Sequence, residues 1–162
     1  MQGVRTERLV LRPFQVAEAE QVVAGRPLPG AVWARDYPAI DDIVGLRGFL
    51  ARCEVDGEPQ PFGAYQIVHR TDRVVIGGLG FHGPPDPSGA VTIGYGVVPS
   101  ARGRGYATEA LRGLLGLARA LKVRCVRGDT THANAASQAV MTGAGMRLVR
   151  EDEESRYYEI RW

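Results

Sequence analysis

Residues Val97–Ala110 read VVPSARGRGYATEA, a passage from strand to helix through a turn rich in glycine and arginine. A hydrophobic strand ends at Val98, a helical pattern begins at Ala107, and two glycines and two arginines lie between them. The first backbone N–H groups of a helix have no partner within it and carry the positive end of its dipole. Because glycine lets a phosphate approach the backbone and arginine adds positive charge, the turn is a candidate anion-binding site.

Two familiar phosphate-binding loops are excluded. A Walker A loop ends in Gly-Lys-Ser/Thr, whereas Tyr106 and Ala107 follow the last glycine here. A dinucleotide-binding loop follows the first strand of a parallel pair, with an acidic residue about 20 residues further on. This turn follows antiparallel strands, and the strand predicted at Val123–Val126 has no acid. Two interpretations remain open: a tight turn with solvated arginines, and an RNA-binding Arg-Gly stretch, for which the segment is short and poor in aromatic residues.

The elements next to the turn predict a mixed sheet. Strands are expected at Ala64–Val68, Val74–Phe81 and Val91–Val98, joined as an antiparallel meander by turns at 71–73 and 83–89. An amphipathic helix from Ala107 to Leu121 follows, and then the strand Val123–Val126. A strand, a helix and a strand in sequence normally form a right-handed parallel crossover. The sheet is therefore expected to combine antiparallel and parallel pairs.

Further elements are expected on both sides of this central region. They are a strand at Thr6–Arg12, helices at Val16–Ala24, Ala39–Val55 and Asn134–Ala144, an irregular segment at 26–30, and a final strand pair at Met146–Arg150 and Tyr157–Arg161. A mixed sheet with helices on both faces is typical of an α/β or α+β domain.

Composition limits the class of protein. The 162 residues, 44% of them hydrophobic, fit one domain over 1–162 with an ordinary core. A net charge of +2 gives no basic face for nucleic acid, no apolar run is long enough to cross a membrane, and the charged N-terminus does not resemble a signal peptide. Cys53 and Cys125 have no metal-ligand spacing and are expected to be reduced core thiols. We therefore expect a cytoplasmic protein without metal, nucleic-acid or membrane partners.

The turn also resembles a known signature. Arg102–Ala107 is similar to the Gln/Arg-x-x-Gly-x-Gly/Ala motif of the GNAT superfamily of N-acetyltransferases, and Asn134-Ala135-Ala136-Ser137 is similar to its Asn-x-x-Ser motif. Thr6–Pro13 resembles the opening of the branch that contains the ribosomal-protein-alanine N-acetyltransferases. The resemblance implies a GNAT-like mixed, mostly antiparallel, splayed central sheet of about six to seven strands flanked by about four helices.

Acetyl-CoA is the co-substrate that this resemblance implies. The loop N–H groups would hold its pyrophosphate, and Thr108 would add a hydroxyl. Its pantetheine arm would lie where two strands splay apart, bonded to the backbone at Val97 and Val98, and one of these two N–H groups would polarise the thioester. Asn134 would orient the pantetheine or brace the splay, besides capping its helix. The implied cofactor contacts are Val97, Val98, Arg102, Gly103, Arg104, Gly105, Tyr106, Ala107, Thr108 and Asn134.

The implied reaction is direct attack of a primary amine on the thioester in a ternary complex. Many relatives place an acidic tyrosine where this chain has Met141, which has no proton to donate, so Ser137 is the candidate acid or else a capping serine. His82 is the candidate base or else a surface histidine, with Glu54 and Asp129 as alternatives.

The acceptor is expected to be a protein N-terminus or a small molecule. Its groove is expected between 28–38, with Trp33 and Tyr37, and the 83–89 hairpin, in a monomer or homodimer. The rival hypothesis is a GNAT-fold module that binds CoA without turnover.

Overall fold

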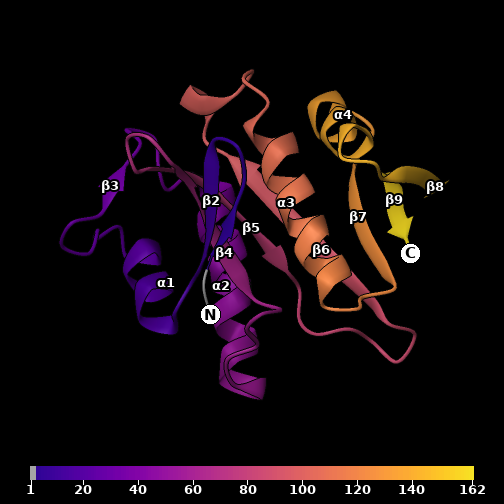
Figure 1. Ribbon diagram of the computed structural model, residues 1–162, viewed down its shortest axis with the longest axis horizontal. Coiled ribbons are helices and arrows are strands. Elements are labelled where there is room, and N and C mark those ends of the chain that lie inside the picture. Colours follow the sequence, from indigo (N-terminus) through magenta and orange to yellow (C-terminus); the bar gives the residue numbers. More distant parts are fainter. Residues whose placement is uncertain (1–2) are drawn as a thin grey trace.

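The computed structural model describes residues 3–162, which form nine strands, four α-helices and one 3₁₀ turn around one mixed sheet (Figure 1). The strand order is β1-β2-β4-β5-β6-β7-β9-β8, and β3 pairs with β5. The β6–β7 and β3–β5 pairs are parallel and the other pairs are antiparallel. The mixed, mostly antiparallel sheet expected from the sequence is confirmed.

The elements have the following bounds. The strands are β1 Val4–Arg5, β2 Leu9–Pro13, β3 Val32–Trp33, β4 Ala64–His69, β5 Val74–Phe81, β6 Ala90–Val97, β7 Cys125–Thr131, β8 Arg147–Glu151 and β9 Ser155–Arg161. The helices are α1 Val16–Val23, α2 Ile40–Asp56, α3 Tyr106–Ala120 and α4 Ala135–Gly143, and the 3₁₀ turn η1 is Pro99–Ala101.

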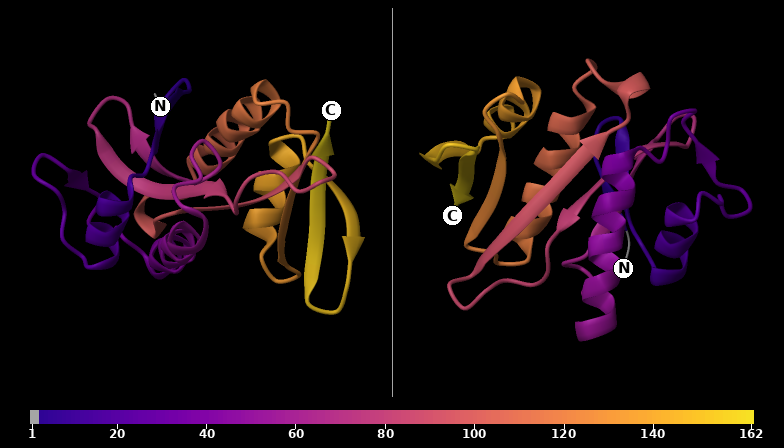
Figure 2. Two further views of the ribbon diagram at one scale, coloured as in Figure 1. Left: turned by 90° about the horizontal axis from the view of Figure 1, so that it is seen from below. Right: turned by 180° about the vertical axis from the view of Figure 1, so that it is seen from behind.

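Helices cover both faces of the sheet, as Figure 2 shows, with α1 and α2 on one face and α3 on the other. The buried side chains of α3 recur every three or four residues at Ala110, Leu111, Leu114, Leu115 and Ala118, so one stripe of the helix packs on the strands. α4 packs against α3. This layering leaves the N-terminus of α3 at the end of β6.

The sheet splays between β6 and β7. The two strands pair only where Ala90–Thr92 lies beside Cys125–Arg127. Beyond that point β6 stays with β5 and β7 stays with β9, so the neighbouring edges part (Figure 1). The splay expected from the family resemblance is therefore present, and it opens toward the turn at residues 98–105.

Some predicted bounds were wrong. β7 continues to Thr131, because Arg127 and Asp129 alternate with the buried Gly128 in a strand with one solvated face. The strand predicted at Thr6–Arg12 is broken by a tight turn, closed by a 2.9 Å bond from the N–H of Thr6 to the carbonyl of Leu9. The two-residue strands β1 and β3 raise the strand count above six or seven.

The described residues also answer two questions about class. None of the helices within residues 3–162 combines the length and apolar character needed to cross a membrane. In the same range, no group of three or more His, Cys, Asp or Glu side chains is placed to hold a metal ion. Cys125 is buried and Cys53 is half-buried, and both are free thiols.

Candidate functional site

The turn between β6 and α3 is exposed and contains two glycines with unusual backbone conformations. After η1, Gly103 and Gly105 take φ values of +78° and +80°, in the left-handed region that favours glycine. The N–H groups of Ala101 and Arg102 bond back to the carbonyls of Val98 and Pro99. Residues 102–105 are exposed. The two glycines therefore turn the backbone so that α3 starts at Tyr106.

The N–H groups of residues 103–108 face this turn. Within the described chain, no hydrogen bond is found for any of these six N–H groups, whereas the N–H of Glu109 already donates to the carbonyl of Gly105 (3.1 Å). Three of the six belong to the first turn of α3, where the helix dipole is positive. The set is thus a cradle of unpaired donors, as helix geometry predicts, and its binding of an anion stays a prediction.

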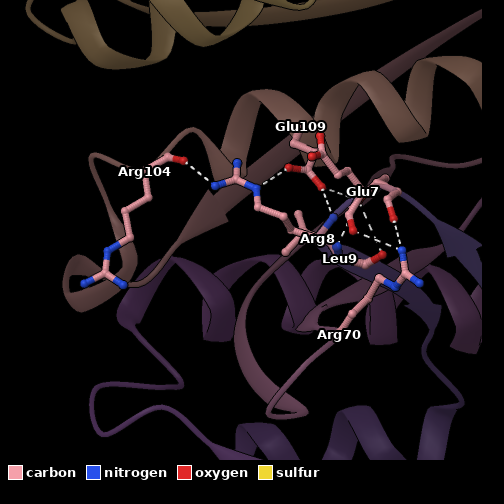
Figure 3. Close-up of polar contacts among 7 residues, drawn as sticks. Glu7, Arg8, Leu9, Arg70, Arg104 and Glu109 are labelled. Carbon is pink, nitrogen blue, oxygen red and sulfur yellow. Dashed lines mark hydrogen bonds and ion pairs between the residues drawn. The ribbon is translucent and has the colours of Figure 1, made fainter.

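The turn between β1 and β2 contacts this cradle and supports it (Figure 3). The carboxylate of Glu109 accepts bonds from the Thr6 hydroxyl (2.5 Å), the Arg8 N–H (2.7 Å) and the Arg8 Nε (2.7 Å). The Arg8 Nη1 donates to the carbonyl of Arg104 (2.8 Å), and its guanidinium lies 4.4 Å from the centre of the Tyr106 ring. Burial would raise the pKa of Glu109, but the bonds from Thr6 and Arg8 hold that pKa below its ordinary value. Sequence reasoning missed this support, because its partners lie about a hundred residues apart.

The backbone of β6 has two distinct edges. The N–H of Val98 donates to the carbonyl of Ile76 on β5 (2.8 Å). Because N–H groups alternate between the edges of a strand, those of Tyr95 and Val97 point to the edge that faces the splay. The choice of Val98 as a donor to the co-substrate is wrong, since its N–H is already used. Tyr95, rather than Val98, has its N–H on the edge that faces the splay, and the alternation itself is the signal that could have found it.

Arg102 is tied to the same strand. Its Nε donates to the carbonyl of Val97 (3.0 Å), so this side chain closes the turn onto the end of β6. Arg104 is exposed, and Figure 3 shows its side chain extending away from Arg8. The two arginines therefore differ: Arg102 has a structural contact, whereas among residues 3–162 no hydrogen bond or ion pair is found for the Arg104 side chain.

The start of α4 meets β6 across the splay. The Asn134 Oδ1 accepts the N–H of Ser137 (3.0 Å), which confirms the predicted cap. The Ser137 Oγ lies 2.6 Å from the hydroxyl of Tyr95, which also donates to the Ser137 carbonyl (3.0 Å). Burial raises the pKa of Tyr95 above its ordinary value, against the opposite effect of the bond to Ser137. Met141 is fully buried. The proton-bearing side chain next to Ser137 is instead the phenol of Tyr95 on β6.

A cavity of about 230 Å³ lies between α2 and the sheet. His82 lines it with an exposed side chain, and partial desolvation, followed by the charge of Arg52, lowers the pKa of His82 below its ordinary value of 6.5. Asp42 also lines it, and burial raises the pKa of this carboxyl to about 6 even though its Oδ2 accepts the N–H of Ala39. Glu54 is exposed on α2 and does not line the cavity, and Asp129 is exposed on β7. His82 and Asp42 therefore line one cavity together with Asp41, Arg52 and three tyrosines, and of the possible proton acceptors there sequence reasoning named only His82.

The segments expected to form the acceptor groove do not line one common cavity. Tyr37 lines the cavity, but Trp33 packs edge-on against Tyr37 and lines a separate open groove beside α1. The 83–89 hairpin does not line the cavity. Most of the roof comes instead from α2, whose helical pattern had suggested only core packing.

Comparisons with known proteins agree with this geometry. Residues 8–147 match the family model of the acetyltransferase (GNAT) domain. A curated relative, the uncharacterized N-acetyltransferase YjdG of Bacillus subtilis strain 168, is 30% identical over 98 residues, which span 60% of this chain and 58% of the relative.

Solved structures share the fold over nearly the whole chain. An acetyltransferase from Agrobacterium tumefaciens strain C58 is 26% identical with a TM-score of 0.69, over 100% of this chain and 95% of that one. A ribosomal-protein-alanine acetyltransferase from Vibrio fischeri is 14% identical with a TM-score of 0.72, over 99% and 97% of the two chains, and shows the fold alone. On the family match, the chain belongs to the GNAT family of acetyltransferases.

Proposed function

We propose that the protein transfers the acetyl group of acetyl-CoA to a primary amine by direct attack in a ternary complex. The observation that carries the proposal is the row of free N–H groups at residues 103–108, set at the mouth of the splay between β6 and β7. A diphosphate needs several convergent donors, and a long thiol arm needs an open strand edge. Both features lie together here.

The co-substrate would be held from its pyrophosphate to its thiol. The six loop N–H groups and the Thr108 hydroxyl would bind the phosphates, with Arg104 adding charge. The pantetheine arm would run along the free edge of β6 and bond the backbone of Val97. Asn134, whose Oδ1 caps α4, would brace the other side of the splay.

The thioester would be polarised by a backbone donor on β6. The N–H of Tyr95 points toward the splay, on the same strand edge as that of Val97 and two residues before it. A preorganised donor of this kind typically lowers a barrier by about 3–4 kcal/mol, because it bonds the developing oxyanion more strongly than the carbonyl. Because this N–H group is fixed within the sheet, little reorganisation is needed at the moment of attack.

The acceptor amine must lose a proton before it attacks. His82 and Asp42 both line the cavity, and their shifted pKa values leave the imidazole neutral and the carboxyl largely ionised at neutral pH, so either group can accept that proton directly or through water. Attack forms the new C–N bond, and collapse of the tetrahedral intermediate releases the CoA thiolate. The linked hydroxyls of Ser137 and Tyr95 lie beside the splay, where they can protonate that thiolate.

Direct transfer is favoured over an acetyl-cysteine intermediate. Burial raises the pKa of both Cys53 and Cys125, so neither thiol is activated as a nucleophile. The rival hypothesis of CoA binding without turnover rests on the acidic tyrosine that Met141 replaces, and the phenol of Tyr95 beside Ser137 supports turnover because it would supply that proton donor. Thiol release with a panel of amines separates the two: tight CoA binding without thiol release from any amine favours the rival.

Binding of acetyl-CoA tests the central observation. At a concentration 100 times its Kd, the ligand stabilises the fold by about 2.7 kcal/mol, which raises Tm by roughly 5–10 °C. Gly105→Glu places a carboxylate in the cradle and is expected to abolish the shift. Gly25→Glu is the matched control, because Gly25 also has a positive φ (+73°) and no atom within 4 Å of an added Cβ, but lies after α1. A shift that survives in Gly105→Glu contradicts the proposed site.

A further inference from the structure

The cavity under α2 exists because four glycines face it. Gly78 and Gly80 on β5 lie directly opposite Gly96 and Gly94 on β6, so all four lack a side chain on the same face. A Cβ at Gly80 would lie 2.5 Å from the Gly63 carbonyl oxygen, and one at Gly94 would lie 3.0 Å from the His82 Nε2. The bare floor leaves a space of about 230 Å³ beside the splay. An apolar cavity of about 150 Å³ already holds benzene, so this space accommodates a small organic molecule.

One end of the cavity is acidic. The Cβ of Asp41 lies 4.0 Å from the position that a Cβ of Gly96 would take. The Asp42 Oδ1 lies 3.6 Å from the corresponding position at Gly78, while its Oδ2 is held by the N–H of Ala39. Asp41 and Asp42 therefore both lie over the paired glycines Gly78 and Gly96, Asp42 with its Oδ1 and the more exposed Asp41 with its Cβ. Gly96 is flanked by the two residues whose N–H groups face the splay, so the acidic end is next to the proposed thioester position.

The other end holds a cation without a counter-ion. The Nε of Arg52 is buried, and within residues 3–162 no hydrogen bond or ion pair is found for this side chain. Its Nη1 folds back along α2 to 3.4 Å from the Cβ position of Gly48. Its charge reaches His82, whose ring lies over Gly94. The half-buried guanidinium thus has a donor that water does not reach and no protein acceptor for it, so the position suits a ligand anion.

Building on the proposed function, we infer that the acceptor is a small zwitterionic amine: its amino group lies beside Asp41 and Asp42, and its anionic group pairs with Arg52. The two ends of the cavity lie over Gly96 and Gly94, which are about 7 Å apart along an extended strand. The ligand therefore carries a carboxylate or phosphate several bonds from its nitrogen. A diamine fits poorly, because its second ammonium would meet Arg52.

A series of ω-amino acids tests this inference. Thiol release from acetyl-CoA is measured for glycine through 6-aminohexanoate, beside n-alkylamines and diamines of equal length, with aminoalkyl phosphates as a separate arm. The amino acids are expected to exceed the alkylamines in kcat/KM by at least 10-fold, with an optimum at an intermediate length. The phosphate arm decides which anion is preferred. A preference for alkylamines or diamines overturns the inference.

Substitution of Arg52 assigns the preference to one side chain. Arg52→Met keeps an unbranched stem and removes the charge, so it is expected to lower kcat/KM for the amino acids 10- to 100-fold relative to kcat/KM for the alkylamines. Arg52→Lys is expected to restore part of the preference. Arg47→Met is the control, because Arg47 is exposed on the same helix and does not line the cavity. An equal loss for all amines in Arg52→Met contradicts the inferred role.

Calorimetry separates this inference from the proposed function. Binding of the same amines is measured with the protein saturated with CoA, so the result does not depend on turnover. If no amine is acetylated, the proposed function fails, while tighter binding of ω-amino acids than of alkylamines still supports the inferred ligand. If amines are acetylated but the anionic group gives no gain in binding or turnover, only the inference fails.

Discussion

Removal of the Glu109 carboxylate is expected to weaken both the fold and the co-substrate site. In Glu109→Ala, the Thr6 hydroxyl and the Arg8 N–H lose a charged acceptor in a partly buried position, each bond contributing about 1 kcal/mol. The ion pair with the Arg8 Nε adds less, about 0.5–1 kcal/mol, because the Arg8 side chain is 38% exposed. The sum is about 3 kcal/mol, which corresponds to a fall in Tm of about 10 °C for a chain of this size.

The difference in unfolding free energy between wild type and the Glu109 variant is expected to depend on pH in one direction. The folded protein holds the pKa of Glu109 below its unfolded value, so the stabilisation is present above the unfolded pKa, about 4.3, and is lost as pH falls through the folded pKa. Urea unfolding of wild type and Glu109→Gln at several pH values should therefore show a gap that narrows below about pH 5. Glu20→Ala is the control, because Glu20 is exposed on α1 and its side chain makes no hydrogen bond or ion pair within residues 3–162.

The coupling to acetyl-CoA is the second measurement. Arg8 joins Glu109 to the Arg104 carbonyl and the Tyr106 ring, so loss of Glu109 also loosens the cradle. Glu109→Ala should then raise the Kd for CoA at a temperature where the variant is still folded, while Glu20→Ala should not. Two results would refute this role of Glu109. One is an unfolding free energy within about 0.5 kcal/mol of wild type, as is usual for surface changes. The other is a stability difference that does not vary with pH.

Three further changes probe the reaction and its acceptor. Tyr95→Phe and Ser137→Ala should each lower kcat about 10- to 100-fold, and the double variant should be no worse than the more damaged single one if the two hydroxyls act as one unit. Asp42→Asn should stabilise the fold by about 1–3 kcal/mol at pH 7 and leave its stability unchanged near pH 4, because the raised pKa of about 6 makes ionisation of Asp42 in the folded protein unfavourable. The pH profile of kcat/KM for this variant should lose any rise near pH 6. Gly94→Ala should displace the His82 ring and raise KM for the amine, with Kd for CoA unchanged by calorimetry.

The parts of this fold that are local in sequence could be predicted. The stripe on α3, the β4–β5–β6 meander and the cap at Asn134 each depend on residues a few positions apart, so hydrophobic spacing and turn residues were sufficient signals. The loop N–H groups belong to the same class, because helix geometry alone leaves them unpaired. The row of unpaired N–H groups could therefore be predicted from fourteen residues of sequence.

The chemistry at the end of the splay could not be predicted in this way. Tyr95 meets Ser137 across 42 residues, and no local pattern marks a tyrosine in a strand as the partner of a helix cap. Asp42 appears in the sequence as an ordinary acidic residue in the first turn of a helix, and it becomes unusual only because α2 lies over a sheet without side chains. Val97 and Val98 were both expected to bond the co-substrate, but the N–H of Val98 pairs with Ile76, and the free edge has the N–H groups of Val97 and Tyr95 instead.

Glycine is needed in the loop cradle and in the floor of the cavity for different physical reasons. Substitution by alanine at one position of each can therefore separate their functions. At Gly103 no atom lies within 4 Å of an added Cβ, but φ is +78°, so Gly103→Ala is unfavourable through backbone conformation and should disturb the cradle. At Gly94 no positive φ is involved, but a Cβ meets the His82 ring, so Gly94→Ala acts through occupied space. Gly103→Ala should then weaken CoA binding, and Gly94→Ala should weaken amine binding. Such a division follows only if the cradle and the glycine floor hold different molecules, which is what a ternary complex requires.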